Sequence, residues 1–309
     1  MGGTLPEAEP TERVPRAGPK ESAWPRISLV TSVHNGERYL EATICSILSQ
    51  GYPNLEYFVI DGGSTDGTVE IIRKYESQLS GWSSEPDRGV YDSLNKGFAR
   101  SNGEVMGWLN ASDMLHTHGL FAVGNVFSSF AEVEWITGRP TLIGEEGWPC
   151  VVKELRRWSR YRFLAGANQH IQQESTFWRR SLWERSGGAF STEFRSEGDF
   201  ELWVRFFRHA RLYTVDALIG GWRAHDDGLS RSNLKLYDGN CDAIIDRELA
   251  SMRDKGESES FCKFIGLVKH TRFVRGIWSR SIIRALYKLP ASDWPPLIEY
   301  CQNQWSMRP

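Results

Sequence analysis

The chain has 309 residues, of which 40% are hydrophobic and 25% are charged, as is usual for a soluble globular protein. Its 37 basic residues nearly balance 39 acidic ones, so the net charge of −2 gives no indication of nucleic-acid binding. The five cysteines form no Cys-x-x-Cys pair, which argues against a zinc site or a disulfide framework and favours a reducing compartment. No apolar run approaches the ~20 residues of a membrane span. Residues 1–24 predict a disordered leader without a secretory signal, and we expect a cytoplasmic protein.

Strands and helices are predicted to alternate from residue 27 to residue 109. Buried strands are expected over 27–33, 55–60 and 105–109, because these runs are short, apolar and bounded by turn residues. This alternation is typical of an α/β fold with a mostly parallel sheet and flanking helices. The helices between the strands are marked by apolar residues at helical spacing, at Leu40 and Leu48, at Val69 and Tyr75, and at Tyr91 and Phe98.

Outside this alternation the pattern is less regular. Asp66 is predicted as the N-cap of the second helix, and the Ser-, Pro- and Gly-rich residues 80–89 as a loop. Residues 139–173 show no clear periodicity, which suits a substrate-binding region. A helix is expected over 199–209, and the 13 tryptophans are interpreted mainly as packing residues rather than as sugar-stacking ones.

Acidic residues follow two of the predicted strands directly. Asp61 comes after the strand 55–60, and Asn110 to Asp113 come after the strand 105–109. If both strands are parallel, these side chains gather at the sheet edge where open α/β sheets bind ligands. A divalent cation with a diphosphate is a suitable partner for such carboxylates. The alternative is that these residues form ordinary turns and helix caps.

Several ordered motifs extend over about 26–230, and together they are similar to a family 2 glycosyltransferase of the GT-A fold, a Rossmann-like fold, in its bacterial form. Any one of these motifs alone would be weak evidence. The motifs are residues 28–37, 46–50, 59–68, 87–92, 95–97, 107–113 and 199–205.

The resemblance implies an enzyme that uses a nucleoside-diphosphate sugar, for which we expect a UDP-sugar. Asp199 would be the general base that takes the proton from the acceptor hydroxyl, so that the anomeric centre inverts. A Mg²⁺ or Mn²⁺ ion would be held by Asp113 and His225. Around the donor, the resemblance places Val33, Asn35, Glu37, Asp61, Asp87 and Asn110, and Lys96 is a candidate to neutralise phosphate.

This chain departs from the family pattern at two points. Asn110 and Ser112 stand where the family usually has the aspartates of its metal motif, so the metal is expected to bind weakly or together with the donor. Gly198 separates Glu197 from Asp199, where an acidic pair is common, which leaves Glu197 as the second candidate for the base. Whether Gln172, Gln173 and Glu174 bind sugar hydroxyls or form an ordinary polar segment stays open.

The predicted domain organisation is a leader, a GT-A domain over 25–230 and a helical C-terminal extension over 231–309. Within the GT-A domain, 25–113 would bind the nucleotide and 114–230 the acceptor. The stretch 263–289 carries seven basic and no acidic residues among apolar ones. Such a segment fits a peripheral contact with the inner face of the cell membrane, or a helix packed on the main domain with a solvated basic face.

Other function classes lack their motifs. The first strand is followed by His34-Asn35-Gly36, where a nicotinamide dehydrogenase needs Gly-x-Gly-x-x-Gly, and no P-loop or nucleotidyltransferase loop occurs. No nucleic-acid partner is expected. An acceptor in cell-surface polysaccharide, lipopolysaccharide or glycolipid synthesis is expected. The remaining alternative is a catalytically weakened relative that binds nucleotide sugars or carbohydrate.

Overall fold

The computed structural model describes residues 24–164, 170–225, 234–256, 262–263 and 294–308. Apart from Trp24 and Lys263, the predicted leader and the basic stretch 263–289 lie outside these residues. Within the described part, no helix is both long and apolar enough to cross a bilayer.

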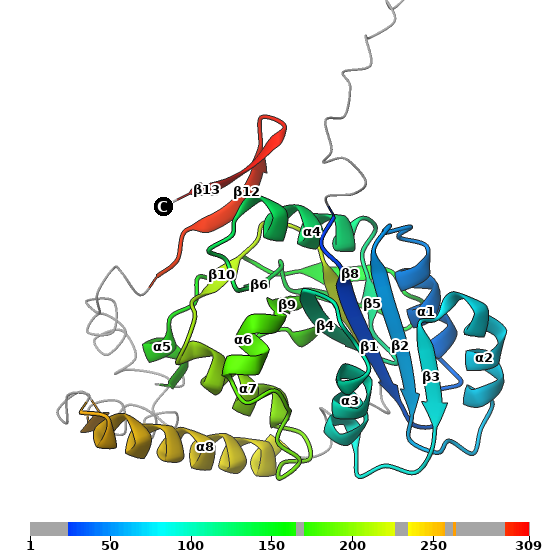
Figure 1. Ribbon diagram of the computed structural model, residues 1–309, viewed down its shortest axis with the longest axis horizontal. Coiled ribbons are helices and arrows are strands. Elements are labelled where there is room, and N and C mark those ends of the chain that lie inside the picture. The colour runs from blue at the N-terminus through cyan, green and yellow to red at the C-terminus, as the bar shows by residue number, and fades with distance from the viewer. Residues whose placement is uncertain (1–23, 165–169, 226–233, 257–261, 264–293, 309) are drawn as a thin grey trace, which may run out of the picture.

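A seven-stranded, mostly parallel sheet forms the centre of the protein, in the order β10-β6-β9-β4-β1-β2-β3 (Figure 1). Strand β9 is antiparallel to both of its neighbours, β4 and β6. The predicted α/β class and its three buried strands are therefore confirmed. The strands of this sheet are β1 (Ile27–Val33), β2 (Leu55–Asp61), β3 (Gly81–Ser84), β4 (Val105–Asn110), β6 (Trp135–Thr137), β9 (Thr176–Arg179) and β10 (Leu212–Thr214).

Helices cover both faces of this sheet. Successive side chains of a strand point to opposite faces, so Leu29 and Val33 enter one core while Val30 enters the other. The first core contains residues of α1 (Leu40–Leu48), α2 (Thr68–Tyr75) and α4 (Gly119–Ser129). The second contains residues of α3 (Val90–Ala99), α5 (Arg160–Leu164), α6 (Arg180–Arg185), α7 (Gly198–Phe207) and α8 (Leu234–Asp254).

Tryptophans fill the middle of the second core. Trp108, Trp135, Trp178 and Trp203 are at most 2% exposed. The ring of Trp203 stacks on those of Trp108 and Trp135, with centroid distances of 5.7 and 5.5 Å. Packing is therefore the role of these four residues, as predicted.

A second, four-stranded sheet has the order β5-β11-β7-β8. It consists of β5 (Met114–Leu115), β7 (Thr141–Ile143), β8 (Pro149–Val152) and β11 (Gly220–Arg223). The residues 139–173, which lack periodicity in the sequence, thus contain two strands and α5. These strands have only three or four residues, too few to show an alternating pattern.

Two further details differ from the sequence-based expectations. The predicted loop over 80–89 contains β3, a four-residue edge strand beside Phe58–Asp61. Helix α2 has Gly67 rather than Asp66 as its N-cap. Asp66, the residue before this N-cap, still accepts the Thr68 N–H through Oδ1 at 3.1 Å. It therefore satisfies one of the backbone donors that the first turn of the helix leaves without a partner.

The C-terminal extension is not helical throughout. Helix α8 agrees with the prediction, whereas β12 (Leu297–Cys301) and β13 (Gln304–Arg308) form an antiparallel hairpin. Gln302 and Asn303 both have positive φ angles, of 50° and 64°, as a two-residue hairpin turn of type I′ requires. Of these two residues, only Asn303 is of a type that favours this turn. The sequence therefore gives only a weak signal for a β-hairpin here.

Glu248 joins α8 to the rest of the second core. Its carboxylate is 2% exposed and pairs with Arg160 at 3.0 Å and with Arg208 at 2.5 Å. We predict that Glu248→Ala lowers the free energy of unfolding by about 3 kcal/mol, because the mostly buried guanidinium of Arg160 and the more accessible one of Arg208 lose their shared counter-charge. Urea unfolding measures this change.

The matched control is Glu193→Gln on the surface. Glu193 also forms an ion pair with an arginine of α8, Arg247, but both side chains are more than half exposed. This substitution should leave the unfolding midpoint nearly unchanged. Equal midpoints for both variants would contradict a stabilising role for Glu248.

Candidate active site

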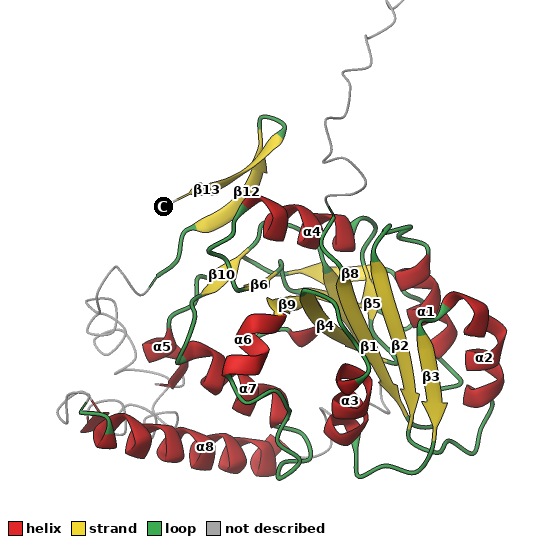
Figure 2. Cartoon of the chain, in the orientation of Figure 1, coloured by secondary structure: helices red, strands yellow, loops and turns green. Residues whose placement is uncertain are grey.

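The candidate site lies at the edge of the large sheet where β2, β1 and β4 end. In the parallel register Asp61 lies beside Val33, and Asn110 lies beside Ser32. Asp61 and Asn110 therefore flank the end of β1, roughly 10 Å apart at the usual strand spacing of ~4.8 Å. In Figure 2 the arrowheads of β1, β2 and β3 point to this edge.

Asp61 is wholly buried at the end of β2 and fixes the loop that follows. Its Oδ2 accepts the Ser64 N–H at 3.0 Å and the Ser84 hydroxyl at 2.6 Å, and its Oδ1 accepts the Ser64 hydroxyl. A carboxylate with several fixed donors around it holds one orientation. Asp61 is thus a rigid element of the sheet edge.

Three other predicted donor-site residues surround the same loop. Val33 O accepts the Gly62 N–H at 2.8 Å. Asn35, whose φ is 51°, accepts the Thr65 N–H through Oδ1 at 2.9 Å, and Glu37 Oε2 accepts the Gly67 N–H at 2.8 Å. The structure therefore brings Val33, Asn35 and Glu37 close to Asp61. Their contact with a ligand stays a prediction.

Asp87 reaches this group from the loop before α3. Its Oδ1 accepts the Gly89 N–H at 2.7 Å, and its Oδ2 accepts the Ser93 hydroxyl. A Cβ atom at position 62 would lie 2.6 Å from Asp87 Oδ2, which is closer than real contacts allow. Gly62 is therefore required for the close approach of Asp87 to the loop after β2.

Asp113 is wholly buried beyond the end of β4. Its Oδ1 accepts the backbone N–H of Arg223 at 3.0 Å, and its Oδ2 accepts the Asn110 side-chain amide at 3.1 Å. Burial raises the pKa of Asp113 to about 7. The bond to Arg223 joins the edge of the large sheet to β11 of the small one.

Asp199 lies in the first turn of α7, against the start of α3. Its Oδ1 accepts the Tyr91 hydroxyl at 3.2 Å and the Phe200 N–H at 2.8 Å. Burial raises the pKa of Asp199 to about 6. The second candidate, Glu197, is wholly buried and accepts the Ser196 hydroxyl at 2.8 Å. Asp199 is the more accessible of the two carboxylates, since it is only partly buried.

Glu174 connects these two parts of the site. It belongs to the short 3₁₀ helix η3 (Gln173–Ser175) and is 3% exposed. Burial and the nearby charges of Asp113 and Asp199 raise the pKa of Glu174 well above its usual value. Glu174 is thus near enough to both Asp113 and Asp199 for their charges to act on it.

Gln172 and Gln173 are partly occupied by protein contacts. Gln172 donates to the Thr141 carbonyl at 2.8 Å and to the Glu174 carboxyl group. Gln173 Nε2 lies 3.5 Å from Asp113 Oδ2. Gln172 therefore serves to position a neighbouring strand, whereas Gln173 borders the site itself.

His225 lies two residues beyond Arg223, with its ring centroid 5.0 Å from that of Tyr39. Its Nδ1 is buried and has no hydrogen-bond partner among the described residues. Such a nitrogen is suited to a metal ion or a phosphate. Across the described residues, no three His, Cys, Asp or Glu side chains are grouped to hold a metal. The residues thus fit an ion that shares its coordination with substrate phosphates rather than a cage made by the protein alone.

Lys96 reaches the same region but is held in ion pairs, and its partner Glu85 donates its backbone N–H to the Asp61 carbonyl at 3.0 Å. The Lys96 ammonium is engaged by Glu85 at 2.9 Å and by Asp92 at 3.6 Å. Lys96 could bind a phosphate only after leaving these ion pairs, so no role at the donor is assigned to it.

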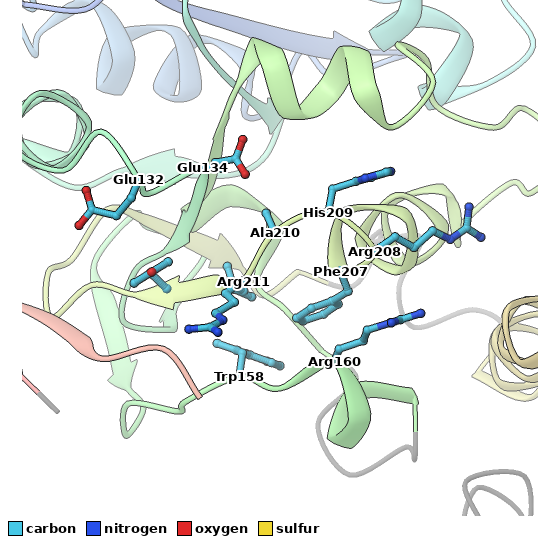
Figure 3. A pocket seen from close by; sticks show the side chains of 11 residues that line it. Glu132, Glu134, Trp158, Arg160, Phe207, Arg208, His209, Ala210 and Arg211 are labelled. Carbon is cyan, nitrogen blue, oxygen red and sulfur yellow. The ribbon is translucent and has the colours of Figure 1, made fainter. Parts of the chain in front are cut away.

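A cavity of about 380 Å³ lies elsewhere, between α7, β10 and the segment before β6 (Figure 3). Glu134 and Arg211 line it and come directly before β6 and β10. Since β6 is parallel to β4, this cavity is at the opposite edge of the sheet. Ligands of open α/β sheets bind at the carboxyl ends of the strands, so it is not the candidate active site.

Sequence reasoning missed Tyr91 and Arg223 as site residues. Tyr91 stands in the motif around Asp87, but nothing in its spacing shows that it meets a residue of α7. Arg223 is 2% exposed and donates from Nε to the Ser112 carbonyl at 2.6 Å. A buried arginine two positions before His225 becomes recognisable only after β11 is placed beside Asp113.

Comparison with known proteins identifies the family of this chain. The family model described as "Glycosyl transferase family 2" matches residues 28–122. An uncharacterized glycosyltransferase of Mycobacterium tuberculosis is 30% identical over 185 residues, which cover 59% of this chain and 68% of that relative. The chain belongs to glycosyltransferase family 2. It is thus an enzyme of the glycosyltransferase class.

Two further similarities concern a relative and a solved structure. The putative teichuronic acid biosynthesis glycosyltransferase TuaG of Bacillus subtilis is 32% identical over 92 residues, covering 29% of this chain and 36% of TuaG. The Staphylococcus aureus TarS 1–349 structure with UDP-GlcNAc has a TM-score of 0.65 at 16% identity, covering 86% of this chain and 77% of that one. This likeness shows that the glycosyltransferase has the GT-A fold.

Arg223 allows a test of how the two sheets are joined at the site. We predict that Arg223→Lys lowers the free energy of unfolding by about 2 kcal/mol, because lysine lacks the planar fork that reaches Ser112 and the turn after β7. Thermal and urea unfolding measure the loss. Arg88→Lys, at a side chain that is 78% exposed, is the control and should behave as the wild type. A loss of similar size in both variants would refute this role.

Proposed function

We propose that the protein is an inverting glycosyltransferase that moves a sugar from a nucleoside-diphosphate sugar to an acceptor hydroxyl. The observation that carries this proposal is the gathering of Asp61, Asp87, Asp113 and Asp199 at one edge of the GT-A sheet. Capping alone would explain any one of these carboxylates but not their shared location.

The nucleotide is assigned to the loops after β1 and β2. Asp61 and Asp87 supply fixed carboxylates for ribose hydroxyls or base N–H groups, and Gly62 lets Asp87 approach the loop after β2 closely. Val33, Asn35 and Glu37 shape the wall of this region. The proposed donor is a UDP-sugar, supported by the likeness to TarS with its UDP-GlcNAc.

The base is assigned to Asp199. Its carboxylate is partly buried and is held by the Tyr91 hydroxyl, so it is oriented before the acceptor arrives. In the ionised state it removes the proton of an incoming hydroxyl as the bond to the diphosphate breaks on the other face of the sugar, which inverts the anomeric centre. Burial and the charges of Asp113 and Asp199 raise the pKa of Glu174 well above its usual value, which favours its neutral form in this region.

A Mg²⁺ or Mn²⁺ ion is proposed as cofactor, bound together with the diphosphate. Asp113 would hold it together with Nδ1 of His225, which has no hydrogen-bond partner in the described part of the chain, with Asn110 alongside. Bound there, the ion would neutralise charge on the departing diphosphate. Because Asp113 is the one charged residue of 110–113, the ion is expected to bind weakly without nucleotide.

The acceptor side is assigned to 114–230 and the nucleotide side to 25–113, within a GT-A domain of 25–230. The similarity to TuaG supports an acceptor in cell-surface polysaccharide synthesis. The basic stretch 263–289 would bring the enzyme to the inner face of the cell membrane through anionic headgroups.

The neutral residues Asn110 and Ser112 favour one second candidate function, that of a weakened relative that binds the donor without turnover.

Replacing the proposed base distinguishes these two candidates. We predict that Asp199→Asn lowers the rate of UDP release from UDP-sugars by about 10²–10⁴-fold, because the amide cannot accept the proton. Stabilisation by UDP with Mn²⁺ in a thermal-shift assay should persist, since the nucleotide site is intact.

Glu201→Gln is the matched control on the same helix, because Glu201 pairs with Arg205 rather than with Tyr91. It should retain turnover. A wild type that binds UDP but releases none from any UDP-sugar would support the binding relative. Unchanged turnover in Asp199→Asn would remove Asp199 from the base role.

The pKa of Asp199 also predicts a pH dependence. Burial raises this pKa to about 6, and the base acts only when ionised, so kcat/KM should fall as the pH drops through about 6, approaching tenfold per pH unit. Initial rates from pH 8 to pH 5, with circular dichroism to verify folding, measure the profile. A flat profile over this range for the folded enzyme would refute an ionised carboxylate as base.

A further inference from the structure

The hairpin that joins β7 to β8 carries an exposed tryptophan. Trp148 is 76% exposed, and it alone is exposed among the tryptophans that the structure describes. Val151 and Val152 in β8 are 45% and 47% exposed. Exposed apolar side chains along one hairpin are typical of a binding surface.

The turn that presents Trp148 is fixed rather than free. The Gly144 N–H donates to the Trp148 carbonyl at 2.9 Å, which closes the turn. The guanidinium of Arg223 donates to the carbonyl of Glu145 and, at 3.4 Å, to that of Gly144. Arg223 in turn donates its backbone N–H to Asp113. The tryptophan is therefore positioned by the residue that also holds Asp113.

The register of the small sheet gives the distance between Arg223 and the turn that carries Trp148. Arg223 lies beside Ile143, and Ile143 lies beside Pro149, the residue after Trp148. Two strand spacings place Pro149 roughly 10 Å from Arg223. Trp148 is thus too far from Asp113 to touch the reacting sugar, yet near enough to contact another ring of the same oligosaccharide.

A cavity of about 310 Å³ lies between the turn and α1. This volume is within the usual range for sites that hold small ligands. Its walls include aromatic, acidic and basic side chains, which together suit the apolar face and the hydroxyl rim of a sugar. Six of the lining residues are Arg38, Tyr39, Met114, Glu145, Glu146 and Arg223.

We propose that the hairpin turn holds part of the acceptor glycan, at a position removed from the ring that receives the sugar. Trp148 would stack on one pyranose ring, and the cavity, whose lining ends at the preceding residue Gly147, would hold an adjoining part of the same glycan. The inference rests on the proposed function, because it assumes transfer at Asp113 and Asp199. A sugar fits better than an anionic membrane surface, since the tip carries Glu146 and a Glu145 that is already neutralised by Arg38 at 2.8 Å, and so offers no excess positive charge to the headgroups. Trp148 therefore sets acceptor specificity by stacking.

The direct test is fluorine NMR of the full chain labelled with 5-fluorotryptophan, with the Trp148 signal assigned from Trp148→Phe. Chitotetraose, cellotetraose and maltotetraose serve as probes, in the presence of UDP and Mn²⁺. We expect at least one of them to shift the Trp148 signal while the signals of the buried tryptophans stay unchanged. No shift with any of the three overturns the proposal.

The kinetic test uses the oligosaccharide that shifts the signal as acceptor. Trp148→Ala should raise its KM about tenfold with little change in kcat, because the lost contact is equal in the ground and transition states. Trp148→Phe should restore most of the affinity. Tyr300→Ala, at an aromatic residue that is 58% exposed on the β12–β13 hairpin, should match the wild type.

The outcomes separate this inference from the proposed function. If the wild type releases no UDP from any UDP-sugar, the proposed function fails. If it does release UDP but Trp148→Ala, folded as shown by its unfolding midpoint, has an unchanged KM, only the present inference fails. Binding to phosphatidylglycerol vesicles that is lost in Trp148→Ala would assign the hairpin to a membrane and also overturn it.

Discussion

The site depends on the parallel pairing of β1 with β2 on one side and with β4 on the other. This pairing places Asp61 beside Val33 and Asn110 beside Ser32, on the two flanks of the end of β1. A slip of one residue in either pair would turn every side chain of that strand to the opposite face and expose its buried residues. The hydrophobic cores on both faces of the sheet therefore also fix the position of the polar residues at its edge.

A second constraint comes from the small sheet. Asp113 accepts a hydrogen bond from the backbone of β11, and the side chain of Arg223 in β11 holds both the Ser112 carbonyl and the turn after β7. The proposed metal region, the histidine beyond β11 and the exposed hairpin are thus connected through one buried arginine. In the family pattern, the aspartates of the metal motif carry the charge of this region. In this chain the arrangement around Asp113 depends largely on Arg223, which lies outside that motif.

The sequence predicted the parts of the molecule in which local patterns are long or distinctive. The strands before Asp61 and Asn110 are continuous apolar runs that end in turn residues, so both the strands and the location of their acids could be inferred. It did not predict β3, β7 or β8, because strands of three or four residues show no period. It also could not predict that Tyr91 meets Asp199 or that Arg223 meets Asp113. Those contacts join residues more than 100 positions apart and arise only from tertiary packing.

The anchoring of the last strands has a consequence for the chain between α8 and β12. Cys262 is buried in the second core, and the Asp216 N–H donates to the Ile298 carbonyl at 2.7 Å, so described residues on both sides of 264–293 are held by the main part of the protein. A chain of this length between two anchors has a reach of at most roughly 50 Å. In the proposed membrane contact, the surface would stay within that radius of the enzyme, and the local concentration of the proposed acceptors on it would rise accordingly.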